Sequence, residues 1–301
     1  MNIALTIVGI VLILEAVRDV FHTLFNPSKQ GDFSEWIAQG IWRGTKRILP
    51  RALNYAGPVA FVSVVLYWTV SMIMGFALIY RPRISHIMAF TSGLDRTDYQ
   101  SFAGALNASI GSLITLSTGI YATHPWLGLI MGTEAVIGFG LLTASVSWIL
   151  SIYPVLEHRK SLAHEASLLH FSEEKGIRRL RDLSETDLHS ILLGLAGQLT
   201  TSRNELIQFP ITYYFHENER QTSLAAILPY LADIAAQNVH REGAVALAAT
   251  VLGGAIDDYL KFVAQTFLKR PFTDRHEVLA AFAADQLRDV VRSPALIPRA
   301  A

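Results

Sequence analysis

The sequence predicts an all-α membrane protein with three transmembrane helices, a short re-entrant helix and loop before the third, and a helical cytoplasmic domain. Three observations predict it. Residues 57–80 and 135–156 are long apolar runs without charge, residues 100–133 are uncharged but partly polar, and charged residues concentrate in the second half. A bilayer core about 30 Å thick needs about 20 apolar residues of helix. We therefore assign 1–156 to a transmembrane domain and 157–301 to a helical cytoplasmic domain.

Composition supports this division. The 301 residues include 25 Lys and Arg, 25 Asp and Glu and no cysteine, so the formal net charge is zero. Balanced charge disfavours a nucleic-acid partner, and the missing cysteines exclude disulfides and thiolate metal ligands. Charged residues make up 17% of the chain, below the roughly 25% of typical soluble domains. Membrane lipids are therefore an expected partner, and nucleic acid is not.

The first predicted span is the least regular. Residues 2–14 are free of charge, and apolar character resumes after Glu15 as far as Phe25. A cleaved signal peptide is the alternative, which the absence of a basic leading region and of a small-residue cleavage site disfavours. Glu15 and Asp19 share one helix face beside Arg18. We expect them to anchor the cytoplasmic end of this helix by pairing locally or with residues 26–56.

The segment between the two strong spans predicts the re-entrant loop. As one helix, residues 100–133 would be about 51 Å long, which exceeds a single span. Residues 101–119 are also rich in Ser, Thr, Asn and Gly, and such a segment lies at membrane depth only where protein or a wet cavity surrounds it. We predict a helix of about 14 residues from Phe102, a polar strand over 115–123, and a new helix near Trp126. The alternative is a four-span bundle in which 101–121 crosses fully.

Charge bias favours the re-entrant alternative. The loop over 26–56 is basic, which is typical of cytoplasmic loops. Its charged residues are Lys29, Arg43, Lys46, Arg47 and Arg51, against Asp32 and Glu35. A re-entrant loop returns Arg159 and Lys160 to the cytoplasm, whereas four full spans would place them outside. The predicted topology therefore has the N-terminus outside and the C-terminus in the cytoplasm.

The order of span, short polar helix, strand and span is the plan of tetrameric potassium channels. Residues 134–147, EAVIGFGLLTASVS, resemble the inner helix of a group of bacterial potassium-channel-family proteins with an extra N-terminal helix. Asp19 and Thr23 match an Asp-x-x-x-Thr pattern at the end of the extra N-terminal helix in that group. Residues 47–58, before the second span, also resemble the group's sequences. The resemblance covers about 1–160. It implies a homotetrameric pore-loop cation channel of the inner membrane, with a permeant monovalent cation (potassium is one candidate) and no other cofactor.

The candidate ion filter departs from the family pattern, which is T-V-G-Y-G or T-L-G-F-G followed by Asp. One register keeps Gly119 as the outer glycine, but it places Ser117 at the inner glycine and Ile120 at the Asp. A register shifted by two residues keeps the inner glycine and loses the outer. A residue with a side chain pays about 1–2 kcal/mol for left-handed backbone angles. We expect weak selectivity, or a non-conducting sensor or scaffold with the channel architecture. The candidate filter residues are Thr115, Leu116, Ser117, Thr118, Gly119, Ile120 and Tyr121.

Three residues of the last span are candidates for pore support or gating. Glu134 lies about 12 Å below Trp126 along the helix, and an intramembrane carboxylate is a functional-site hypothesis by default. We expect it to brace the pore helix through Ser or Thr hydroxyls, with gating or proton sensing as the alternative. Gly138 and Gly140 fit either a gating hinge or close helix packing.

The sequence of the second half predicts helices over 188–199, 222–239, 242–268 and 274–292. The uncharged run 243–256 is short for a span and predicts a buried core helix. Ser184 begins a capping arrangement before the first of these helices. No nucleotide-binding motif, metal-ligand set or nucleophile–base pair is recognisable, so we expect no enzymatic activity. Adjacent Asp257 and Asp258 point to different sides of a helix and predict a solvated face.

Overall fold

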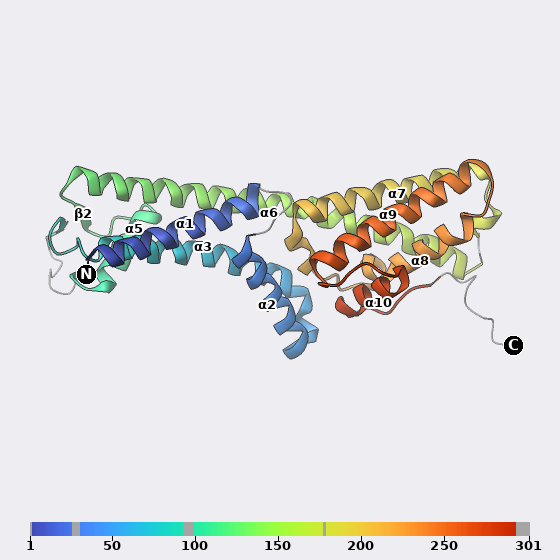
Figure 1. Cartoon of the computed structure of the whole chain (residues 1–301), viewed down its shortest axis with the longest axis horizontal. Coiled ribbons are helices and arrows are strands. Elements are labelled where there is room, and N and C mark those ends of the chain that lie inside the picture. Colours follow the sequence, from blue (N-terminus) through green and yellow to red (C-terminus); the bar gives the residue numbers. More distant parts are fainter. Residues whose placement is uncertain (1, 26–30, 93–98, 177–178, 293–301) are drawn as a thin grey trace. The chain divides into compact units, whose positions relative to one another are not determined.

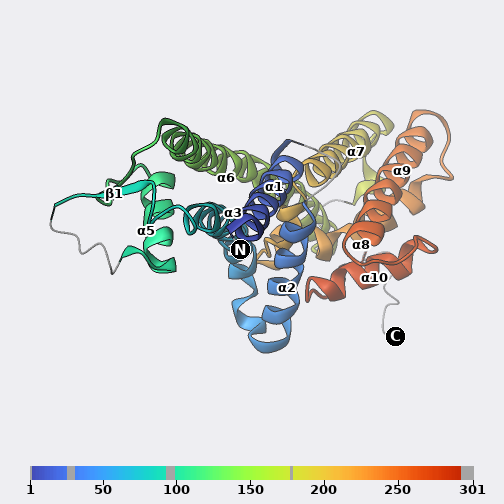
Figure 2. The same cartoon turned by 60° about the vertical axis from the view of Figure 1, so that its left-hand side comes forward.

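The computed structural model describes residues 2–25, 31–92, 99–176 and 179–292. The chain divides into two compact units, both built mainly of helices (Figures 1 and 2). The first unit comprises Met1–Ile48 and Pro58–Ser151, and the second comprises Leu49–Gly57 and Ile152–Ala301. The change of unit falls inside one continuous helix, α6 (Pro125–Glu174).

The first unit contains the apolar helices and a two-stranded sheet. Strand β1 follows α3 and strand β2 precedes α6, and the two strands pair antiparallel with Ala89 opposite Tyr121. This pairing brings the end of α3 and the start of α6 to the same end of the unit. Its elements are α1 (Asn2–Phe25), α2 (Asp32–Ile48), most of α3 (Ala56–Tyr80), β1 (Met88–Phe90), α5 (Phe102–Leu113), β2 (Ile120–Ala122) and the beginning of α6.

Among the described residues, three helices are long and apolar enough to cross a membrane. They are Pro50–Tyr80, which includes α3, Pro125–Glu174, which is α6, and Gly243–Thr266, which is α9. The sequence also predicted three spans, but the predicted spans include α1 and not α9. Helix α1 is not one of the three in the structure because Glu15, Arg18 and Asp19 lie close together in its sequence. Its place as a span therefore remains a prediction.

The outward faces of α3 and α6 are apolar. Leu66 and Val70 of α3, and Leu129 and Phe139 of α6, each leave more than half of their surface uncovered in the single chain. Soluble monomers rarely expose contiguous apolar patches of this kind, whereas lipid or further protein would cover them. Together with the long apolar helices, these faces are typical of a membrane protein.

The second unit is a bundle of helices. Helices α7 and α9 pack lengthwise, and α8 is buried along nearly its whole length (Figure 1). As predicted, Ser184 caps α7 by accepting a hydrogen bond from the Asp187 amide at 3.2 Å. The last helix ends earlier than predicted, and Leu287 beyond it has a left-handed backbone with φ 50°. The helices are the end of α6, α7 (Glu185–Gln208), α8 (Leu224–Asn238), α9 (Gly243–Thr266) and α10 (Arg275–Asp285), with short 3-10 turns that include η1 (Pro50–Tyr55) and η3 (Pro210–Tyr214).

Helix α9, the third of these apolar helices, packs within the second unit. It buries Leu252, Ile256 and Leu260 against its neighbours, whereas Leu247 and Val251 are exposed. Asp257 pairs with Arg275 of α10, and Asp258 pairs with Arg203 of α7. The predicted core helix is therefore only partly buried in the single chain, and α9 is also a candidate span.

Candidate functional site

Helix α5 is too short to cross a bilayer. It has 12 residues, close to the predicted length, and would extend about 18 Å. Ser101 caps its start by accepting a hydrogen bond from the Gly104 amide. In Figure 2, α5 runs across the direction of α3 and α6 rather than alongside them. Since β1 and β2 are paired, the chain enters and leaves this segment at the same end of α3 and α6.

A buried carboxyl holds α5 against both long helices. Glu134 of α6 is completely buried, and its two oxygens have different partners. The Tyr80 hydroxyl of α3 donates to Glu134 Oε2 at 2.6 Å, and the Ser109 hydroxyl of α5 lies 2.5 Å from Glu134 Oε1. Ser109 also donates to the Ile73 carbonyl at 3.0 Å. One side chain of α6 thus links α3 and α5.

A second link joins α5 to α6 one turn further on. The Ser112 hydroxyl donates to the Met131 carbonyl at 2.7 Å. At the end of α5 the Leu113 carbonyl lies so close to Gly138 that a methyl group at that position would overlap its oxygen. Gly138 therefore permits close packing, whereas a side chain on Gly140 would meet no atom of the described residues within 4 Å other than the adjacent backbone of its own helix.

After α5 the chain reverses direction in a tight turn, which contains the first residues of the predicted filter. Thr115 has a left-handed backbone with φ 57°, and the Leu116 amide donates to the Gly111 carbonyl at 2.7 Å. The side chains of Thr115, Leu116 and Ser117 are exposed in the single chain. Gly119, with φ 74°, ends this turn and precedes β2.

The outer residues of the predicted filter are hydrogen-bonded to β1 and to Thr91, the residue that follows it. The Gly119 carbonyl accepts hydrogen bonds from the Thr91 amide at 2.8 Å and from the Thr91 hydroxyl at 3.1 Å. Ile120 and Tyr121 belong to β2, in which successive carbonyls point in opposite directions. The predicted strand over 115–123 is therefore regular only over Ile120–Ala122, and residues 115–118 are the stretch outside the sheet.

The predicted anchor at the end of α1 has a specific structure. Asp19 is buried and accepts hydrogen bonds from the Ser34 hydroxyl, from the Phe33 amide at 3.1 Å and from Trp68 Nε1 at 2.8 Å. Thr23 accepts from the Gly31 amide at 3.0 Å. The Asp-x-x-x-Thr pattern therefore fixes the start of α2 against α1 and α3.

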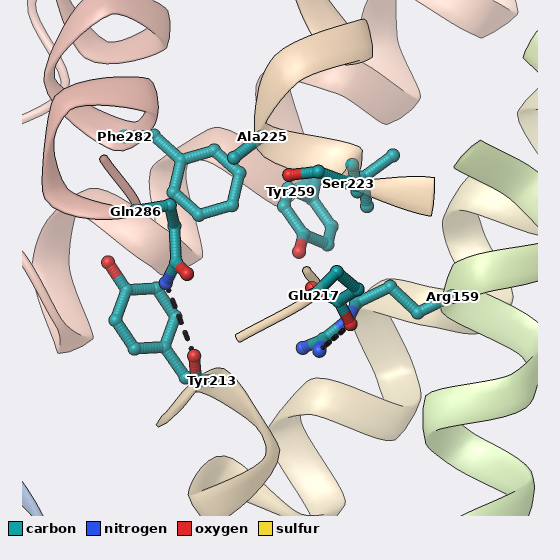
Figure 3. A pocket seen from close by; sticks show the side chains of 9 residues that line it. Arg159, Tyr213, Glu217, Ser223, Ala225, Tyr259, Phe282 and Gln286 are labelled. Carbon is teal, nitrogen blue, oxygen red and sulfur yellow. Dashed lines mark hydrogen bonds and ion pairs between the residues drawn. The ribbon is translucent and has the colours of Figure 1, made fainter. Parts of the chain in front are cut away.

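The second unit contains a buried ion pair that sequence reasoning missed. Arg159 of α6 donates to the carbonyls of Thr212 and Phe215 at 2.8 and 2.7 Å and pairs with Glu217 (Figure 3). Beside it lies a cavity of about 10 Å³, room for about one water molecule. Tyr259 also lines this cavity, which is too small for an organic ligand.

Two neighbours of this ion pair have shifted acidities. Burial, reinforced by Asp285, raises the pKa of the Tyr213 hydroxyl, which donates to Asp285 at 2.6 Å. Burial, together with the Arg288 charge, lowers the pKa of His216, whose Nε2 lies 3.1 Å from Arg288 Nη2. His216 is thereby held neutral as a hydrogen-bond acceptor. These two contacts, to Asp285 and Arg288, hold residues 213–217 against the segment that ends α10.

Within the described ranges, no group of three or more His, Asp or Glu side chains is arranged to hold a metal ion. No family model, curated protein or solved structure matches this chain.

Proposed function

We propose that the protein is a homotetrameric pore-loop cation channel of a bacterial inner membrane, with weak selectivity among monovalent cations. The observation that carries the proposal is the arrangement of α5. This short helix lies in the sequence between two long apolar helices, is bonded to them through Ser109, Ser112 and Glu134, and is followed by the exposed residues 114–117. In lipid, backbone polar groups must find partners within protein or water. Residues 114–117 can therefore lie exposed at membrane depth if further copies of the chain surround them.

Four copies around a central axis would satisfy this requirement. The exposed turn of each copy would then face a shared aqueous path, with α6 lining the rest of the pore. Glu134 would serve as a brace behind the pore helix and not as an ion ligand, because both its oxygens are bonded within one chain. In this proposal the second unit lies in the cytoplasm, which the basic loop before α3 and the basic flank after the last span favour.

The expected weak selectivity has a geometric reason. Strong potassium selectivity uses consecutive rings of carbonyl oxygens. Gly119 directs its carbonyl to Thr91, and β2 alternates its carbonyls, which leaves residues 115–118 to contact ions. The hydroxyls of Thr115, Ser117 and Thr118 would supplement the remaining carbonyls. Rotatable hydroxyls define a less rigid site than a fixed column of carbonyls does.

The same observation favours a second candidate function. Two hydrogen bonds from Thr91 occupy the Gly119 carbonyl, a group that an ion-conducting filter would direct at the permeating ion. A non-conducting membrane sensor or scaffold, which keeps the architecture and uses the second unit for signalling, needs no carbonyl column. Current through the purified tetramer separates the two functions.

The cysteine-free chain permits a direct experiment. Ser117→Cys would place a thiol in the exposed turn, and Gly197→Cys would place one on an open position of α7. The proposal predicts cation current in planar bilayers that a cationic thiol reagent blocks only in the Ser117→Cys protein. Intact tetramers without current would support the scaffold, and a stable monomer by native mass spectrometry would refute both the pore and the tetramer.

A further inference from the structure

Helix α2 has one buried face and an exposed aromatic residue on the opposite side. Ser34, Ala38 and Trp42, spaced four residues apart, form the buried face. Trp36 leaves 74% of its surface uncovered, and Gly40 on the same side is exposed. Phe33, at the start of the helix, is partly exposed and stacks on Tyr67 of α3. An exposed tryptophan, apolar in its ring and polar at its N–H group, is typical of a membrane interface.

The position of α2 in the first unit also favours a membrane surface. The hydrogen bonds from Phe33 and Ser34 to Asp19 hold its beginning at the end of α1. From that point, α2 turns away from the direction shared by α1 and α3 (Figure 1). A helix that leaves transmembrane helices at a steep angle from their membrane-edge end is directed along the bilayer surface.

Charge selects the kind of lipid. The acidic residues Asp32 and Glu35 occupy the first turn, and Arg18 of α1 lies 3.5 Å from Asp32. Among charged residues, the later turns carry only basic ones. Arg43 and Arg47 lie three and seven positions after Gly40 and therefore continue the side of the helix that carries Trp36. The charged residues of the later turns are Arg43, Lys46 and Arg47. Long basic side chains beside an interfacial tryptophan can place their stems near the apolar layer and their charges among lipid phosphates.

We propose that α2 lies in the cytoplasmic surface of the membrane and binds anionic phospholipids. Trp36 would enter the boundary between headgroups and acyl chains, Gly40 would lie beside it, and Arg43 and Arg47 on the same side would contact the phosphates. Interfacial helices bind in this way through buried apolar area and attraction of basic residues to anionic headgroups. The inference does not require that the protein conducts ions.

Spin labelling of the full-length protein in vesicles tests the proposal. Gly40→Cys and Gly194→Cys are matched variants, since each replaces a helical glycine with open space around it in a chain without cysteine. In vesicles that contain phosphatidylglycerol, the label at residue 40 should be accessible to oxygen and shielded from a water-soluble nickel chelate. The label at residue 194 should be accessible to the chelate.

The charge contribution is tested in the same samples. With Arg43→Gln and Arg47→Gln, the ratio of membrane-bound to released α2 should fall about fivefold for each arginine removed. In phosphatidylcholine alone, the unmodified helix should already show this weaker protection. Chelate access at residue 40 equal to that at residue 194 would overturn the proposal. So would protection from both reagents, which would indicate a protein partner, or protection that ignores lipid charge.

Discussion

The brace at Glu134 gives the most quantitative prediction. Glu134→Ala removes the acceptor for the Tyr80 hydroxyl, whereas Ser109 keeps its bond to the Ile73 carbonyl. One orphaned buried hydroxyl costs about 1–3 kcal/mol, and each lost buried methylene about 0.8 kcal/mol. We therefore expect Glu134→Ala to lower the free energy of unfolding by about 2–4 kcal/mol. Glu134→Gln keeps a carbonyl for Tyr80 and offers an amide to Ser109, so its loss should stay below about 1 kcal/mol.

Equilibrium unfolding in mixed micelles, by titration with a denaturing detergent, measures these differences. Ser145→Ala is a suitable control because the buried Ser145 hydroxyl of α6 has no partner within the described residues, so its removal should cost nothing. A Glu134→Ala protein as stable as the unmodified one, or a Gln variant as unstable as the Ala variant, would refute the brace. A proton sensor would instead lose the pH dependence of its current in Glu134→Gln.

Further substitutions test other parts of the structure. Gly138→Ala should destabilise the first unit measurably in a thermal melt because of its close contact with α5, whereas Gly140→Ala should be neutral or stabilise its helix by up to about 1 kcal/mol. Arg159→Met should cost about 3–5 kcal/mol, and adding Glu217→Met should recover much of that loss in a double-mutant cycle. The pKa of His216 is lowered in the folded state, so the unfolded state binds more protons. Stability should therefore fall as the pH drops below about 6.5, less steeply in His216→Gln; an equal slope in both proteins would contradict the assignment.

Local patterns in the sequence predicted the helical elements well. The polar composition of 101–119 predicted a short helix near Phe102, and the structure has one over Phe102–Leu113. Ser184 predicted the start of α7 because a helix cap is set by residues a few positions apart. The same reasoning placed Asp19 near the loop after α1, where it bonds to Phe33 and Ser34.

Partners distant in sequence could not be predicted in this way. The three residues of β1 show no distinctive alternation, so their pairing with β2 and the engagement of Gly119 by Thr91 had no local signal. Nothing near Glu134 identified Tyr80, and nothing near Arg159 identified Glu217. Such contacts depend on how the helices pack. The candidate spans also differ from the predicted ones, because length and composition select α9 and do not select α1.

The reversal potential of the purified protein, with potassium on one side of a planar bilayer and sodium on the other, tests the central claim most directly. A pore whose ions contact only residues 115–118 should pass both cations, and the current should reverse close to zero millivolts. A reversal potential that indicates strong preference for potassium would contradict the weak selectivity. The complete absence of current from intact tetramers would contradict the channel itself.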